Sequence, residues 1–128
     1  MNNINKISTL SNEFLQRISV IDDNIKSLWC AGEIDKKWSK MPTVSIVGSR
    51  KPTEYGRSVT LKLASALAAR GVIVISGLAL GHDALSARGA LDAGGATIAV
   101  IGNELNCIHP RSNQNLADEI VTSGGAIL

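Results

Sequence analysis

Three continuous runs of apolar, largely β-branched residues constrain the fold of this sequence more than any other feature. They lie at Val44–Val47, Val72–Ile75 and Thr97–Ile101. Nearly every position in these runs is apolar, whereas a strand with one wet face would alternate. Such runs are typical of strands that are covered on both faces, as in a parallel sheet flanked by helices.

The segments between the runs carry helical patterns. From Thr53 to Arg70, apolar residues recur every four positions, Thr53 or Ser49 can cap the start, and Gly71 stands where a helix-ending glycine belongs. Two further helices are expected at Asp83–Ala93 and Ser112–Ser123, before a last strand at Ala126–Leu128. The βα alternation predicts an α/β fold class, namely a Rossmann-like three-layer α/β/α architecture with a mostly parallel sheet and right-handed crossovers.

The chain divides into two parts by composition. Residues 1–42 are polar and mixed, and we interpret them as an N-terminal extension with a short helix at Phe14–Ile21 and a strand at Leu28–Ala31. Residues 43–128 form the Rossmann-like domain, which we expect to bind phosphate or DNA. Because the sequence stops within what reads as a fourth strand, we expect either a piece of a longer protein or an unusually short version of one.

Bulk properties narrow the class of protein. The 128 residues carry a formal net charge of +2 and two cysteines that lie far apart, so neither a disulfide scaffold nor a zinc site is expected. No stretch approaches the roughly 18 apolar residues of a membrane span, and the first twenty residues lack the apolar core of a signal peptide. We therefore expect a cytoplasmic protein with no membrane partner and no cofactor.

Small and polar residues follow each of the three predicted strands, at Gly48–Arg50, Ser76–Gly81 and Gly102–Glu104. In an open parallel sheet, ligands bind at the carboxyl ends of the strands, near the point where the strand order reverses. Glycines there let backbone amides approach an anion, and the guanidinium of Arg50 can bind phosphate oxygens in a fork. The pattern predicts a phosphate-bearing ligand, although the same glycines could simply form tight turns. The dinucleotide fingerprint and the P-loop pattern are both absent.

The order and spacing of these motifs resemble the DNA-processing protein A family (DprA, also called Smf). The resemblance is carried by Val47-Gly48-Ser49-Arg50, Tyr55-Gly56, Ser76-Gly77-Leu78-Ala79 with Gly81 and Asp83, Thr97-Ile98-Ala99-Val100, and Pro110 with Asn113. It implies a Rossmann-like domain that binds single-stranded DNA, dimerises and loads the recombinase RecA onto incoming DNA during natural transformation. It implies no enzymatic step.

The resemblance also implies a set of residues that bind DNA. These are Gly48, Ser49, Arg50, Lys51, Tyr55, Ser76, Gly77, Gly81, Arg111 and Asn113. The first three would lie against a phosphate. Tyr55 could stack on a base or simply pack. Arg111 could bind phosphate or be an ordinary surface charge.

The sequence departs from the family pattern at several positions, which are His82, Ala87, Glu104, Asn106 and His109. The family's later Arg-Asn-Arg segment would lie beyond Leu128. Much of the dimer surface and of the RecA contact would lie there as well, so the sequence assigns neither partner to these residues.

Other functions stay open at this stage. A small-nucleotide sensor or enzyme could use the same scaffold, and so could a domain that only pairs with other proteins. His82 and His109 are too few for a metal site, and Cys107, His109 and Glu104 are too close in sequence for a catalytic group. We therefore expect no catalytic and no metal-binding residue.

Two further assignments are purely structural. Asp83 is expected to cap the second helix. Trp29 and Trp38 are expected to be packing residues rather than platforms on which bases stack.

Overall fold

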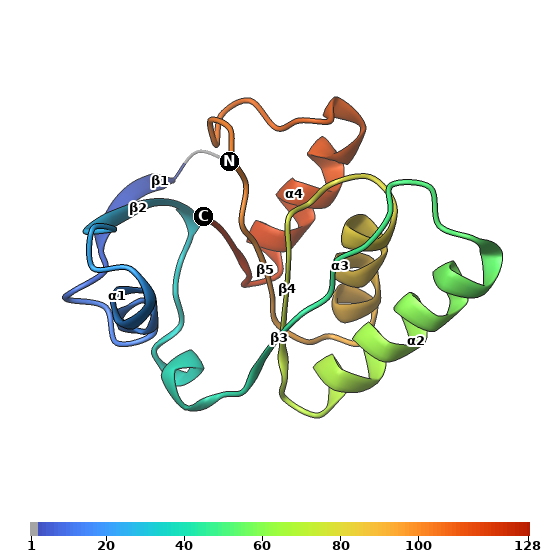
Figure 1. Cartoon of the computed structure of the whole chain (residues 1–128), viewed down its shortest axis with the longest axis horizontal. Helices are drawn as coiled ribbons and strands as arrows, with labels where there is room; N and C mark the ends of the chain where they lie inside the picture. The colour runs from blue at the N-terminus through green and yellow to red at the C-terminus, as the bar shows by residue number, and fades with distance from the viewer. Residues whose placement is uncertain (1–2) are drawn as a thin grey trace.

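The predicted alternation of strands and helices is present in the structure, a computed structural model that describes residues 3–128 (Figure 1). In chain order the elements are β1 (Ile4–Ser8), α1 (Gln16–Ile21), β2 (Ser27–Gly32), the 3-10 helix η1 (Lys36–Lys40), β3 (Thr43–Ser45), α2 (Glu54–Ala69), β4 (Ile73–Ser76), α3 (His82–Asp92), β5 (Thr97–Ala99), the 3-10 helix η2 (Arg111–Asn113), α4 (Gln114–Thr122) and β6 (Ala126–Ile127). Within residues 3–128, no helix is long and apolar enough to span a bilayer.

All six strands belong to one sheet, with the order β1-β2-β6-β5-β4-β3. The pairs β3·β4, β4·β5 and β5·β6 are parallel, and β2 pairs antiparallel with both β1 and β6. The predicted Rossmann-like fold with a mostly parallel sheet is therefore confirmed. The parallel strands follow one another in a single direction across the sheet, so their order does not reverse within residues 3–128, and the expected switch point is not found there.

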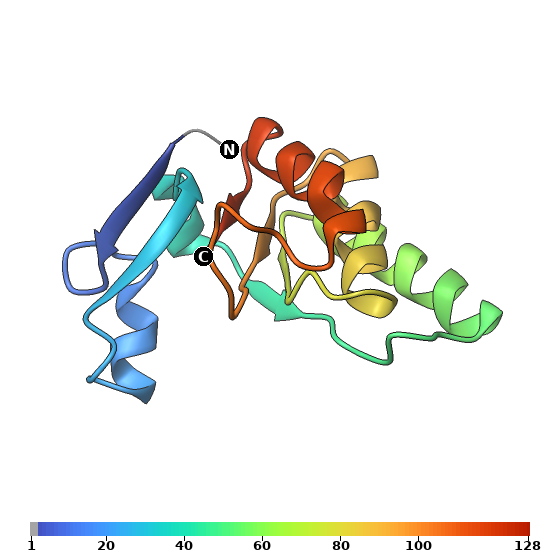
Figure 2. The ribbon, with the colours of Figure 1, turned by 90° about the horizontal axis from the view of Figure 1, so that it is seen from above.

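The three long helices cover one face of the sheet. Right-handed crossovers that all step in the same direction place every crossover helix on the same side, and α2, α3 and α4 lie together beside the strands (Figure 2). Small residues allow close packing between helices and sheet, since Ala64 and Ala68 of α2 meet Ala90 of α3 and Val74 of β4 in one buried cluster. The crossover helices therefore form a single layer.

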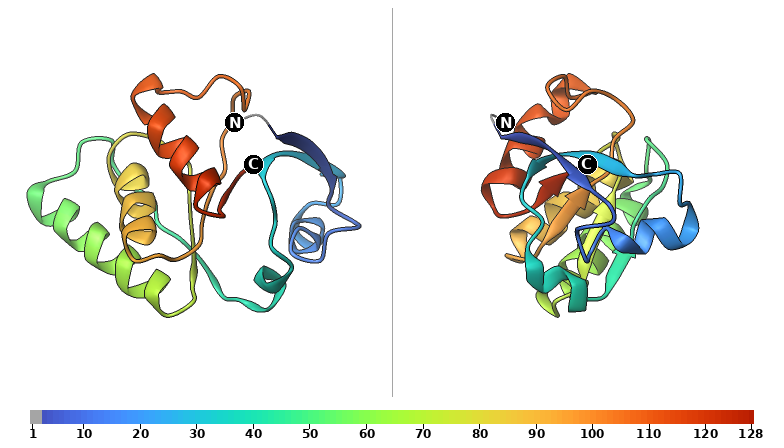
Figure 3. Two further views of the ribbon diagram at one scale, coloured as in Figure 1. Left: turned by 180° about the vertical axis from the view of Figure 1, so that it is seen from behind. Right: turned by 90° about the vertical axis from the view of Figure 1, so that its left-hand side faces the viewer.

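The first 42 residues cover part of the other face. Trp38 of η1 is 1% exposed and packs with Phe14, at 5.9 Å between ring centroids, in a cluster that includes Ile73 and Ile98 of the central strands. The hairpin of β1 and β2 carries α1 at one edge of the sheet (Figure 3). Residues on both sides of position 42 thus share one sheet and one core.

Two predictions about the N-terminal part differ from the structure. Strand β1 was not expected, because its sequence Ile-Asn-Lys-Ile-Ser contains only two apolar residues. Its pairing with residues 27–31 of β2 stabilises it instead. Trp29 is not the packing residue that was predicted, since it is 58% exposed, with the Lys6 ammonium 5.8 Å from its ring. Trp38 is buried as predicted.

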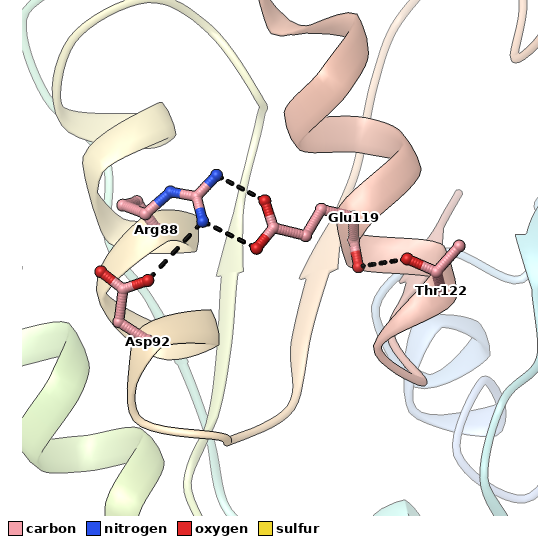
Figure 4. A network of polar contacts seen from close by, with 4 residues as sticks. All are labelled: Arg88, Asp92, Glu119 and Thr122. Atoms are coloured by element: carbon pink, nitrogen blue, oxygen red, sulfur yellow. Dashed lines mark hydrogen bonds and ion pairs between the residues drawn. The ribbon is translucent and has the colours of Figure 1, made fainter.

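A charged contact joins α3 to α4. The guanidinium of Arg88 donates to both carboxylate oxygens of Glu119, at 2.8 and 2.6 Å, and lies 3.6 Å from Asp92 (Figure 4). The Thr122 hydroxyl donates to the backbone oxygen of Glu119 in the same network. The hydrogen bonds between the two side chains lower the pKa of the Glu119 carboxyl and raise the pKa of the Arg88 guanidinium. This fork fixes the relative position of the two helices.

Candidate functional site

Two loops meet at the carboxyl edge of the parallel strands. The first, residues 46–53, connects β3 to α2, and the second, residues 77–81, connects β4 to α3. A Cβ added at Gly81 would lie 2.3 Å from the backbone oxygen of Ser49 and 2.7 Å from the carbonyl carbon of Arg50. The His82 amide donates to the same Ser49 oxygen at 3.2 Å. Only glycine allows this approach, because Gly81 also has a φ of +83°.

The first loop presents unpaired cations and amides to solvent. Gly48, Ser49, Arg50 and Lys51 are all exposed. The Ser49 hydroxyl accepts from the Lys51 amide at 3.1 Å, which closes a tight turn. Among residues 3–128, neither Arg50 nor Lys51 has an ion-pair partner, and the Gly48 and Ser49 amides have no hydrogen-bond acceptor. The turn therefore has the charge and the free donors that an anion needs.

The start of α2 is capped by its own residues. Of the two predicted caps, Thr53 and Ser49, Thr53 is the N-cap, and its hydroxyl accepts from the Gly56 amide at 3.0 Å. Glu54 occupies the first turn, so a carboxylate already lies at the positive end of this helix. Arg50 lies in the loop before the cap. The Gly56 amide is therefore not free for a ligand.

Tyr55 is the exposed aromatic residue beside the first loop. Its side chain is 80% exposed, so it does not pack in the interior. Of its two predicted roles, base stacking stays a prediction, and simple packing is wrong.

The turn after β4 is held from inside by Asp83. Its carboxylate accepts from the Gly77 amide at 2.8 Å and is buried. Gly81, rather than Asp83, precedes the first residue of α3, so the prediction that Asp83 caps this helix is wrong. The reason is geometric, because Asp83 lies within the first turn and reaches back to the end of the strand. The Gly77 amide is consequently not free for a ligand.

Ser76 lies beneath this turn. Its side chain is 3% exposed, and its hydroxyl has no hydrogen-bond partner within residues 3–128. Ser76 thus bounds the site from below and does not present its hydroxyl at the surface.

Asn113 brings a third segment to the same edge. Its side-chain amide is buried and donates to the backbone oxygen of Leu78 at 2.8 Å. Leu78 is itself buried with a φ of +59°, so the turn needs such a fixed contact. Arg111 lies two residues before Asn113 and is exposed. Asn113 therefore shapes the turn, and Arg111 supplies a further charge beside it.

The loop after β5 places Glu104 beside the hairpin of β1 and β2. The Asn103 amide donates to the Cys107 oxygen at 2.6 Å, and Glu104 lines a cavity of about 470 Å³ together with Trp29 and Leu105. The loop after β5 contacts the turn after β4 through the shared buried cluster of Leu78, Leu105 and Ile108. Glu104, in contrast, lies on the side of the hairpin. No group of three potential metal ligands occurs within residues 3–128.

A model of the family described as DNA recombination-mediator protein A matches residues 5–128. The chain belongs to this family. The resemblance stated from the sequence motifs is confirmed.

The curated relatives come from several bacteria. Protein Smf of Escherichia coli (strain K12) is 42% identical over 85 residues, which are 66% of this chain and 23% of that protein. DNA processing protein DprA of Bacillus subtilis (strain 168) is 35% identical over 117 residues, which are 91% of this chain and 39% of that protein. The chain thus spans between about a quarter and two fifths of the length of these relatives.

Solved structures of family members share the fold. DNA processing protein A from Streptococcus pneumoniae superimposes with a TM-score of 0.81 at 31% identity, covering 98% of this chain and 43% of that one. The protein from Helicobacter pylori superimposes with a TM-score of 0.78 at 31% identity, covering 98% of this chain and 55% of that one. The latter structure is described as showing the single-stranded DNA binding mode of that protein.

One important residue of this family member was not predicted from the sequence. The His82 ring contacts the loop that carries Arg50, and its Nδ1 lies 2.6 Å from the Thr60 hydroxyl. Gly48 in that loop and Gly56 in the first turn of α2 belong to the sequence motifs. Nothing in their spacing shows that one imidazole fills the space beside both.

Proposed function

We propose that this chain binds single-stranded DNA through the turn at Gly48–Lys51. Backbone amides and the Arg50 guanidinium would hold one phosphate, and Lys51 and Arg111 would attract its neighbours. Gly77, Gly81, Ser76 and Asn113 would shape the site, and Tyr55 would offer a face for a base. The role is binding, with no bond made or broken in the DNA.

The proposal rests mainly on two exposed cations that lie side by side on a tightly held turn. Arg50 and Lys51 have no acidic partner within residues 3–128, although the chain holds eleven acidic residues. The contact of Gly81 with Ser49 fixes the backbone beneath them. Membership of a recombination-mediator family and the single-stranded DNA binding mode described for the Helicobacter pylori protein support the same ligand.

The test is a salt titration of binding to a fluorescent oligo-dT. Each phosphate contact releases counterions, so the logarithm of the affinity should fall linearly with the logarithm of the salt concentration. Arg50→Ala should weaken binding about tenfold or more and reduce the slope by roughly 0.7, the value for one contact to a single strand. Arg70→Ala is the matched control, because Arg70 lies at the far end of α2 and is also exposed.

The outcomes test the site, the ligand and the non-catalytic role separately. If Arg50→Ala binds as the parent does, the proposed site is wrong. If AMP or NAD raises the melting temperature and the oligonucleotide does not, the small-nucleotide alternative replaces the proposal. Recovery of shortened DNA after incubation would contradict the non-catalytic role.

The wider role proposed is that of a recombination mediator in natural transformation. Such a protein would act in the cytoplasm, dimerise and pass the bound strand to the recombinase RecA. The corresponding tests are sedimentation of the full-length protein and its capture by purified RecA with and without oligo-dT.

A further inference from the structure

The imidazole of His82 fills the space beside the turn that carries Arg50. A Cβ added at Gly48 would lie 2.6 Å from His82 Cδ2, and one added at Gly56 would lie 3.0 Å from His82 Cε1. Gly48 follows β3, and Gly56 lies in the first turn of α2. The ring thus lies against the loop at Gly48 and against the start of α2 at Gly56, two positions where no side chain obstructs it.

Two hydrogen bonds hold this residue in place. Its Nδ1 lies 2.6 Å from the hydroxyl of Thr60, which is buried on the inner side of α2. Its backbone amide donates to the Ser49 oxygen at 3.2 Å. His82 is also the first residue of α3. One residue therefore connects α2, α3 and the loop between β3 and α2.

The loop has few other connections to the rest of the protein. The Ser49 hydroxyl bond and the Thr53 cap are both local to the loop and the start of α2. At the start of the loop, the Ile46 amide donates to the Ile75 oxygen of β4 at 3.0 Å. Beyond Ile46, the contacts within residues 3–128 that reach another element are those with Gly81 and His82. A loop that is already ordered costs less free energy to immobilise when the ligand arrives, so the protein binds that ligand more tightly.

We propose that His82 is a positioning residue for DNA binding: its imidazole, held by Thr60, keeps the Gly48–Arg50 turn against the start of α3. The inference rests on the proposed function of that turn. His82 itself does not touch the DNA. It raises affinity by keeping Arg50 and the free amides in their binding arrangement.

The experiment compares three variants in the same salt titration with oligo-dT. His82→Ala should weaken binding roughly tenfold with an unchanged salt slope, because no phosphate contact is lost. His82→Asn keeps a polar atom near the position of Nδ1 and should recover most of the affinity. Thr60→Val keeps the shape of the threonine but removes the hydroxyl, and should weaken binding a few-fold. Circular dichroism of each variant monitors folding.

The outcomes separate this inference from the proposed function. If His82→Ala binds as the parent does while Arg50→Ala is impaired, the site stands and the positioning role is overturned. If His82→Ala lowers the salt slope as Arg50→Ala does, His82 contacts DNA directly, and positioning is again overturned. If neither variant is impaired, the proposed site itself is wrong. Should His82→Ala fail to fold, His82→Asn and Thr60→Val decide the question, since parent-like affinity of Thr60→Val would exclude a role for the hydroxyl bond.

Discussion

Replacing Gly81 by alanine tests the contact on which the site is built. Gly81 has φ +83° and ψ −129°, a region that is essentially restricted to glycine. The added methyl carbon would lie 2.3 Å from the Ser49 oxygen, which is about 1 Å short of van der Waals contact. Because the neighbours are backbone atoms, the variant must either move the loop or strain the turn.

The expected cost follows from these two terms. A non-glycine residue in such a backbone conformation costs about 1–3 kcal/mol, and forcing an extra methyl group into a packed contact costs about 1–3 kcal/mol. The free energy of unfolding should fall by roughly 2–6 kcal/mol, which lowers the melting temperature by about 8–24 °C for a domain of this size. Movement of the loop should also weaken oligo-dT binding at least several-fold.

Gly71→Ala is the matched control. Gly71 also has a positive φ, +81°, but no atom lies within 4 Å of an added Cβ. It follows α2 at the opposite edge of the sheet. In Gly71→Ala the free energy of unfolding should fall only by the cost of a left-handed backbone for alanine, about 1–2 kcal/mol. The variant should bind DNA as the parent does.

The assay is urea unfolding of the parent and both variants, with oligo-dT titrations under conditions where each is folded. If Gly81→Ala is no less stable than Gly71→Ala and binds DNA with parent affinity, the two loops do not depend on their backbone contact. The reasoning that places Arg50 through Gly81 would then be refuted.

Three further predictions concern the rest of the chain. Hydrogen bonding to Arg88 lowers the pKa of the Glu119 carboxyl in the folded protein. The stability that this ion pair contributes is therefore present above the unfolded pKa of about 4.3 and is lost as the pH falls through the lower pKa of the folded state. The urea midpoints of the parent and Glu119→Gln should differ at neutral pH and converge near pH 3, and a constant difference would contradict this. Trp38→Ala should cost about 3–5 kcal/mol in urea unfolding, because the buried ring anchors the second face of the sheet, and a loss below about 1 kcal/mol would argue against that role. A thiol reagent at mildly alkaline pH should label the exposed Cys107 and spare Cys30, since burial raises the pKa of the Cys30 thiol to about 11, and equal labelling rates would count against this assignment.

The elements of the site were largely predictable from the sequence. Apolar runs identified β3, β4 and β5, and the strand-end glycines located the loops, because an apolar run needs little beyond its own composition to be recognised. The prediction that all three strands are covered on both faces is wrong for β3, because β3 is an edge strand whose residues are exposed or only partly buried. Thr53 was recognisable as a cap, since capping depends on local sequence. The antiparallel strand β1 was not predictable, because its partner β2, twenty residues away, determines it.

The chain's own sequence thus determined the βα alternation, the parallel sheet and the family, since each follows from local pattern and motif spacing. Only the tertiary structure decided which loop residues are free. The Asp83 carboxylate accepts from the Gly77 amide, and the Asn113 side-chain amide donates to the Leu78 oxygen. The His82 ring lies against the loop before α2. These contacts join segments that are distant in sequence, or side chains that point back on their own helix. Their partners are chosen by the three-dimensional packing of the elements and cannot be read from spacing along the chain.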